Sequence, residues 1–182
     1  MLKITEIKKE TMPTSSWSGG TTTEIMIYPE GASYAARDFL FRISTASVEL
    51  ESSDFTQLDG FFRVIASLDG EMLLSHSLHC GEIKKRVLPL DTVHFFDGGI
   101  PTHCEGKARD LNLMMKLGAL DGDMRFVEGG EKVVLPLDKG EFALVYSIDS
   151  GDARFAEADE ADHLVFTAEG KSALLTVKLT DL

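Results

Sequence analysis

Turn signals recur along this chain at short intervals and leave little room for long helices. They stand at Gly19-Gly20, Asp59-Gly60, Asp69-Gly70, Asp97-Gly98, Asp121-Gly122, Gly129-Gly130 and Lys139-Gly140. Between them lie short runs of β-branched and aromatic residues, a pattern typical of a β-sandwich or β-barrel. The best helix candidate, Ala153 to His163, lacks an apolar stripe, and we expect an acidic exposed connection there. The predicted fold class is therefore all-β.

Two parts of the chain resemble each other weakly and predict a repeated fold. Val64–Asp69 matches Leu144–Asp149 at an offset of 80 residues, Asp91–Phe95 matches Asp162–Phe166 at 71, and Leu111–Leu117 matches Ala173–Leu179 at 62. The distance between matching segments falls along the chain, while the alternation of inward and outward residues stays the same. This is expected when connections lose residues and core strands do not. We expect one domain of residues 1–182 with a first half of about 1–119 and a shorter second half of about 120–182.

Composition excludes several classes of function. The chain has 30 acidic and 18 basic residues and a formal charge of −12, which repels nucleic acid and anionic lipid. Lys84-Lys85-Arg86 is the only basic triplet, and a solvated loop or strand edge explains it better than an anion site. We see neither a signal peptide nor a membrane span, so a cytoplasmic location is the default expectation. Exposed strand edges leave room for a homodimer.

Metal and nucleophile signatures are weak. Barrels of this kind often bind a metal through a His-x-His strand pair, whereas His76 and His79 are three residues apart and would point to opposite faces. Cys80 and Cys104 form no metal-type pair, and no nucleophile elbow surrounds the serines near Trp17. We therefore predict no metal site, no cofactor and no catalytic residue.

Polar side chains interrupt three strands that are otherwise apolar. By the alternation of a β-strand, three pairs each share a face: Thr22 with Glu24, Arg42 with Ser44, and Asp110 with Asn112. Burying an unpaired polar group costs about 2–7 kcal/mol, and a charge costs more. One polar pocket shared by the three strands explains the pattern. In the second copy of the repeat, Ser172 and Leu174 take the positions of Asp110 and Asn112. Because this polar pair is lost there, we expect the pocket in the first half only.

The arginines decide what such a pocket would bind. Arg42 stands between Phe41 and Ile43, and a guanidinium there needs a carboxylate, either from a ligand or from Glu24 or Asp110 of the chain itself. Both alternatives stay open. Arg63 joins the candidate set, although a strand-start side chain that reaches solvent is its simpler interpretation. Trp17, the only tryptophan, either closes the pocket as an aromatic platform or packs over the barrel end.

At these residues the chain resembles the HutD/Ves family of cupin-like proteins. The matching segments are Trp17 with Gly19–Ile25, Phe39–Ala46, Phe55–Gly60 with Arg63, and Asp110–Met114. The resemblance implies a bicupin-like double-stranded β-helix, in which two jelly-roll halves share one core. It also implies an association, in some members, with histidine-utilisation genes and a proposed role in binding N-formylglutamate or a related acylated amino acid.

Three functions compete at this stage. The first is a metal-free binding protein for a small carboxylated metabolite, in which Arg42 holds the carboxylate, Glu24, Asp110 and Asn112 receive amide or amine groups, and Trp17 closes the mouth. The second is a cupin-type isomerase or hydrolase with Glu24 or Asp110 as a general base. The third is a structural role in which the polar cluster only fixes the fold.

Overall fold

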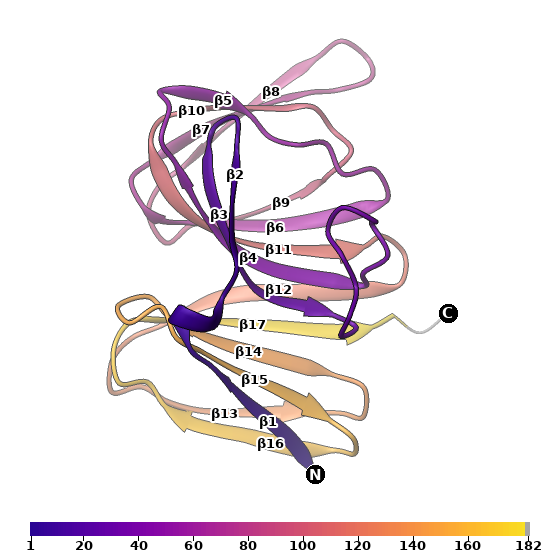
Figure 1. The fold of residues 1–182 in the computed structure, drawn as a ribbon, viewed down its shortest axis with the longest axis vertical. Coiled ribbons are helices and arrows are strands. Elements are labelled where there is room, and N and C mark those ends of the chain that lie inside the picture. The colour runs from indigo at the N-terminus through magenta and orange to yellow at the C-terminus, as the bar shows by residue number, and fades with distance from the viewer. Residues whose placement is uncertain (181–182) are drawn as a thin grey trace. The chain divides into compact units, whose positions relative to one another are not determined.

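The computed structural model describes residues 1–180, and their regular structure is almost entirely β-strand, which confirms the all-β prediction (Figure 1). The chain forms two compact units. The larger unit is Pro13–Leu117, and the smaller unit is Met1–Met12 together with the chain from Gly118 onward. The helical turn η1 (Lys9–Thr11) lies in the smaller unit. Among residues 1–180, no helix is long and apolar enough to cross a membrane.

The larger unit contains two antiparallel sheets. In spatial order the six-stranded sheet has β2 (Thr14–Trp17), β3 (Gly20–Tyr28), β4 (Phe41–Val48), β11 (Ala108–Lys116), β6 (Phe61–Asp69) and β9 (Val93–Asp97). The four-stranded sheet has β5 (Ser52–Asp54), β10 (Thr102–Glu105), β7 (Met72–Ser77) and β8 (Ile83–Leu88). The central strands bury both faces: Ile43, Val64 and Leu113 lie on one face, and the polar residues predicted from sequence lie on the other.

The smaller unit also contains two antiparallel sheets. Its five-stranded sheet has β1 (Leu2–Ile7), β15 (Ala153–Ala158), β14 (Phe142–Ser147), β17 (Ser172–Leu179) and β12 (Leu120–Val127). Its two-stranded sheet has β13 (Lys132–Leu137) and β16 (Asp162–Thr167). Apolar side chains from both sheets, among them Val133, Ala143, Leu164 and Leu174, form one buried cluster. The interior of this unit is therefore an ordinary hydrophobic core.

The two units repeat one connectivity, as the sequence comparison predicts. Strands β4, β5, β6, β9, β10 and β11 pair among themselves in the same pattern as β12, β13, β14, β15, β16 and β17. Even the register is kept: Leu113 of β11 lies opposite Val64 of β6, and their counterparts Leu175 and Leu144 lie opposite each other. The larger unit adds the β7–β8 hairpin and the strands β2 and β3.

Three sequence-based expectations need correction. The Asp91–Phe95 match to Asp162–Phe166 is wrong, since the pairing equates β9 with β15. The expected exposed connection from Ala153 is strand β15, which pairs with both β1 and β14. Its alanines gave no strand signal, but small side chains fit a crowded interior once β1 and β14 supply hydrogen bonds. Met1–Met12, assigned by sequence to the first half, belong to the smaller unit through β1.

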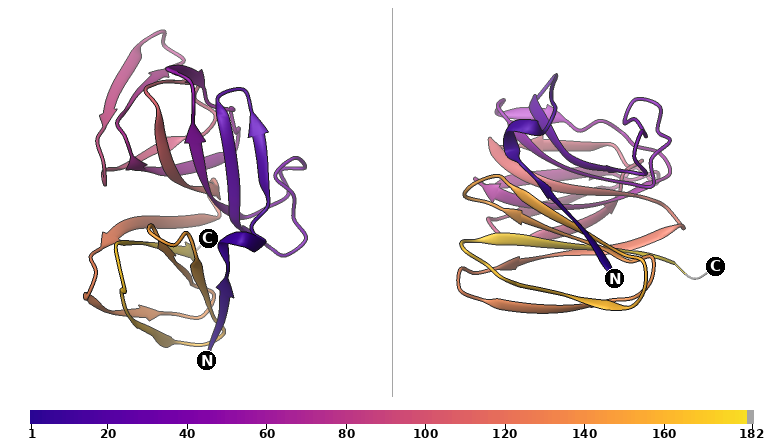
Figure 2. Two further views of the ribbon diagram at one scale, coloured as in Figure 1. Left: turned by 60° about the vertical axis from the view of Figure 1, so that its left-hand side comes forward. Right: turned by 60° about the horizontal axis from the view of Figure 1, so that its bottom comes forward.

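The basic triplet lies at a strand edge, as expected. Lys84, Lys85 and Arg86 occupy the exposed strand β8, which pairs only with β7 and ends the four-stranded sheet. The hairpin projects from this edge of the larger unit (Figures 1 and 2). Charged side chains on an edge strand discourage pairing with another sheet, so the triplet has a sufficient structural explanation.

Candidate functional site

The predicted polar residues meet on one face of the six-stranded sheet. Cross-strand pairing arranges them in three rows over β4, β11 and β6: Arg42–Met114–Arg63, Ser44–Asn112–Ile65 and Ala46–Asp110–Ser67. On β3, Glu24 lies opposite Ser44 and Thr22 opposite Ala46. Side chains within a row are about 4.5–5.5 Å apart at Cβ. Strand alternation and register together are therefore sufficient to gather the set.

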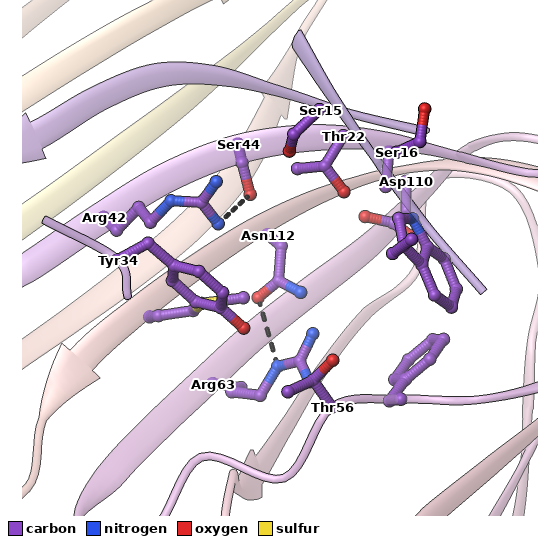
Figure 3. Close-up of a pocket in the computed structure, with 14 residues that line it drawn as sticks. Ser15, Ser16, Thr22, Tyr34, Arg42, Ser44, Thr56, Arg63, Asp110 and Asn112 are labelled. Atoms are coloured by element: carbon purple, nitrogen blue, oxygen red, sulfur yellow. Dashed lines mark hydrogen bonds between the residues drawn. The ribbon is translucent and has the colours of Figure 1, made fainter. Parts of the chain in front are cut away.

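A cavity of about 290 Å³ opens over this face (Figure 3). Seven of the eight predicted residues line it: Trp17, Thr22, Arg42, Ser44, Arg63, Asp110 and Asn112. Glu24 does not line the cavity and instead binds the guanidinium of Arg42. Sequence reasoning missed the other lining residues: Ser15, Ser16, Tyr34, Ala46, Phe55, Thr56 and Met114.

Arg42 is neutralised by its own chain. Its Nε donates to Glu24 Oε2 at 2.7 Å, so of the two internal ion pairs considered, the one with Glu24 forms. A register shift between Glu24 and Met26 leaves Ile25 as the extra residue of β3. The Arg42 guanidinium also lies 4.3 Å from the centre of the Tyr34 ring. Only 5% of Arg42 is exposed, and of the two alternatives that the sequence left open, the internal ion pair is the one that forms.

Arg63 is the free cation, and the prediction that it reaches solvent is wrong. Only 6% of the residue is exposed. Its Nε donates to Asn112 Oδ1 at 3.5 Å, the limit of a hydrogen bond, and its guanidinium lies 5.1 Å and 5.3 Å from the ring centres of Phe55 and Phe96. Within residues 1–180, no carboxylate lies within ion-pair distance of it. Burial lowers the pKa of Arg63, and the more distant Asp110 opposes that shift.

Asp110 is the second unsatisfied group. It is 3% exposed, and its Oδ1 is buried without a hydrogen-bond donor. Burial raises the pKa of this carboxyl to about 7, against the opposing effect of Arg63. The site thus contains a cation without an anion at contact distance and a carboxyl close to its titration point at neutral pH.

A neutral histidine pair lies behind Arg63. The Thr102 hydroxyl donates to the Ile100 carbonyl, so it accepts from His76 Nδ1 at 2.9 Å, and His76 Nε2 then accepts from His94 Nε2 at 2.9 Å. Burial and Arg63 lower the pKa of His76. Burial, followed by His76 and Arg86, lowers the pKa of His94 to about 4. The pair is therefore uncharged at neutral pH and adds no second positive charge beside Arg63.

Trp17 borders the cavity beside Phe55, with an edge-to-face contact and ring centres 6.4 Å apart. Its indole Nε1 is buried and has no hydrogen-bond partner. Gly19 is the reason that the ring can lie here, because a Cβ at this position would overlap the indole and would lie 2.8 Å from Ser53 Cβ. Gly19, the first glycine of the pair, thus leaves room for an aromatic ring at the cavity wall.

Gly19→Ala should displace the indole and cost about 1–3 kcal/mol of stability, as overpacking does. Because Trp17 is the only tryptophan, its fluorescence reports the movement directly. We expect a red-shifted emission maximum from the variant and no shift from Ser18→Ala, whose side chain is exposed. An unchanged spectrum in Gly19→Ala would contradict this packing.

Tyr34 had no recognisable sequence signal. It comes from the irregular segment between β3 and β4, and its ring lies between Arg37, 4.0 Å away, and Arg42. Such a placement depends on how a loop folds back over a sheet, and strand periodicity says nothing about that. Phe55 and Thr56 belong to a quoted segment of the family resemblance, and that resemblance was the available pointer to them.

The smaller unit is apolar at the positions that match Arg63 and Asn112 of the larger unit. The register that equates β6 with β14 and β11 with β17 places Ala143 at the position of Arg63 and Leu174 at the position of Asn112. Both residues belong to the buried apolar cluster of that unit. The polar interior is therefore not required by the shared connectivity, which favours a site in the larger unit, as the repeat predicts.

Solved structures with similar folds include two from pseudomonads. One is the conserved protein of unknown function PA5104 from Pseudomonas aeruginosa PAO1, with a TM-score of 0.79, 22% identity, and coverage of 98% of this chain and 100% of that chain. The other is HutD from Pseudomonas fluorescens SBW25, solved in a formate condition, with a TM-score of 0.77, 22% identity and the same coverage. A search of curated proteins gave no match.

The fold is also that of a cupin. Oxalate decarboxylase from Bacillus subtilis matches with a TM-score of 0.58 and 7% identity, over 97% of this chain and 77% of that chain. That protein is described as having Mn(II) centres. Here the residues do not fit such a centre, because the described part of the chain brings no three His, Cys, Asp or Glu side chains together as metal ligands. The cavity presents two guanidinium groups instead.

A family comparison agrees with the fold. The HutD family model matches residues 9–179, which include every strand of the larger unit and all the polar residues of the cavity. The segments quoted for the resemblance, from Trp17 to Met114, lie within the matched range. The chain therefore belongs to the HutD family.

Proposed function

We propose that the cavity of the larger unit binds a small metabolite that carries a carboxylate, of the type of N-formylglutamate or another acylated amino acid. The observation that carries the proposal is Arg63, a buried guanidinium beside a cavity with no carboxylate of its own at contact distance. A buried charge without a partner costs several kcal/mol. A ligand carboxylate would supply two charge-assisted hydrogen bonds and remove that cost.

The size and remaining chemistry of the cavity support this class of ligand. About 290 Å³ is just below the range of about 300–1,000 Å³ that is usual for small-molecule sites, which suits a molecule of amino-acid size. Ser44, Thr22 and Asn112 offer hydroxyl and amide groups for a polar ligand backbone. Glu24 is already bound to Arg42, and Tyr34 already contacts Arg37 and Arg42. Neither is free for an ammonium group, so among the residues that the structure describes, Asp110 is the one carboxyl of the cavity that a ligand nitrogen could meet. An acylated nitrogen carries no charge and does not require that carboxyl to be ionised.

The direct test is binding by the unmodified protein. Calorimetry and thermal shift should show a saturable response to N-formyl-L-glutamate and a weaker response to L-glutamate, whose amino group is charged. Formate and urocanate complete the panel, as the smallest carboxylate and as a planar acid. If none of the four raises the melting temperature or gives heat of binding at millimolar concentration, the proposal is wrong.

One observation favours a second candidate, a hydrolase or isomerase with a carboxylate base. Asp110 is buried in the cavity, and its pKa of about 7 suits a general base at neutral pH. Incubation of N-formyl-L-glutamate with the protein, followed by proton NMR, separates the two functions. Binding alone leaves the formyl signal unchanged, whereas release of formate that Asp110→Asn abolishes would establish the enzyme.

A further inference from the structure

We propose that Asp110 is protonated when the cavity holds its anion and donates a hydrogen bond to it, so that binding takes up as much as one proton from solution, depending on pH. This inference rests on the proposed function and adds the role of one residue. It makes the site a proton-coupled receptor, in which the anion is bound by a guanidinium on one side and by a carboxylic acid on the other.

Among residues 1–180, Arg63 is the one cation whose charge acts on Asp110. Asp110 projects from β11 between Ala46 of β4 and Ser67 of β6, and neither residue is charged. Arg63 acts on it at a distance, since the two do not make contact. Arg42 is neutralised by Glu24 of β3. The positive charge of Arg63 is what stabilises an ionised Asp110, and an anion bound to Arg63 therefore neutralises that charge.

The other groups around Asp110 are neutral or remote. They are the Trp17 indole on β2, the Asn112 amide on β11, the Cys104 thiol on β10, Tyr34 from the segment after β3, and the His76–His94 pair on β7 and β9. Burial raises the pKa of Cys104 to about 12, so it carries no charge near neutral pH. None of these groups can balance a second negative charge in the cavity.

Two carboxylates in one buried site do not both stay ionised. Like charges at close range favour a state in which the pair shares one proton, as in other carboxylate dyads. The buried Oδ1 of Asp110, which has no donor, then receives the proton and becomes a donor itself. The protonated Oδ1 can then donate a hydrogen bond to the carboxylate of the ligand, so that both oxygens have a partner.

The test is calorimetry with N-formyl-L-glutamate in buffers of different ionisation enthalpy. The slope of the observed heat against that enthalpy gives the number of protons exchanged. Because free Asp110 titrates near pH 7, we expect uptake of about 0.5 proton near pH 7 and about 0.9 near pH 8. The dissociation constant should rise about tenfold per pH unit above pH 8.

Asp110→Asn supplies the decisive comparison, because an amide donates without titrating. We expect its proton uptake to vanish and its dissociation constant to become independent of pH between about 6 and 8.5. Asp69→Asn, an exposed carboxylate at the end of β6, should behave like the unmodified protein. If Asp110→Asn does not fold, the pH profile of the unmodified protein decides alone.

Three outcomes overturn the proposed role of Asp110, and only one of them also overturns the receptor function. Binding without proton uptake near pH 8, or equal uptake in Asp110→Asn, removes the role of Asp110 and leaves the receptor function intact. No binding of any acid by the unmodified protein removes the receptor function and this role together.

Discussion

Replacing Arg63 by Met is expected to weaken anion binding strongly and to make the ligand-free protein more stable. The guanidinium is the single cation of the cavity that lacks a carboxylate at contact distance, so its loss should weaken binding about 100-fold, the equivalent of its charge-assisted hydrogen bonds. Removing a buried cation that has no carboxylate at contact distance also removes its desolvation cost, which is several kcal/mol for an unpaired ion. The loss of the long-range interaction with Asp110 offsets part of that gain. Loss of function with gain of stability is the signature of a binding residue.

Calorimetry with N-formyl-L-glutamate and thermal unfolding without ligand measure the two effects separately. The melting temperature should rise by about 2–4 °C for each kcal/mol gained. Lys85→Met is the matched control, since it removes one positive charge from the exposed strand β8 and should change neither quantity. A destabilised Arg63→Met that still binds the acid would show that Arg63 has a structural role instead.

Glu24→Gln is expected to have the opposite effect on stability. It leaves Arg42 buried without its carboxylate, and breaking a buried ion pair costs about 3–5 kcal/mol. We expect the lower end, about 3 kcal/mol, because the Glu24 side chain is 24% exposed. The unfolding transition should therefore move to clearly lower temperature and denaturant concentration.

A double variant tests whether the loss of stability comes from the buried charge that is left without a partner. Arg42→Met combined with Glu24→Gln should recover most of the loss, because no buried charge is left unpaired. Glu6→Gln is the control: its 2.6 Å ion pair with Arg154 is exposed and should contribute less than about 1 kcal/mol. Equal losses in Glu24→Gln and Glu6→Gln would mean that burial does not decide the strength of the Arg42 pair.

Sequence reasoning predicted most of the polar residues that line the cavity because strand alternation is a local rule. The spacing of two between Arg42 and Ser44, and between Asp110 and Asn112, fixes a shared face before any partner strand is known. It could not decide which arginine is free. That answer depends on the register of β3. Glu24 lies opposite Ser44, Ile25 is the extra residue that follows it, and the Glu24 carboxylate contacts Arg42. Register is a tertiary property and leaves no local mark.

The errors have a common physical origin. Arg63 was expected to reach solvent because it stands near the start of a strand, yet β9, Phe55 and Phe96 enclose it. Strand β15 was expected to be a connection because alanine and acidic residues have low β-propensity, yet β1 and β14 pair with it on both sides. In each case neighbours distant in sequence overrode a local preference.

Because the connectivity is duplicated, a polar interior and a mainly apolar interior occur in two separate copies of the same fold. Polar substitutions inside a barrel normally reduce the apolar burial that makes folding favourable. Here the second copy, with Ala143 and Leu174 where the first has Arg63 and Asn112, retains its own hydrophobic cluster. Changes at a few inward-facing positions of the first copy therefore leave the hydrophobic cluster of the second copy intact.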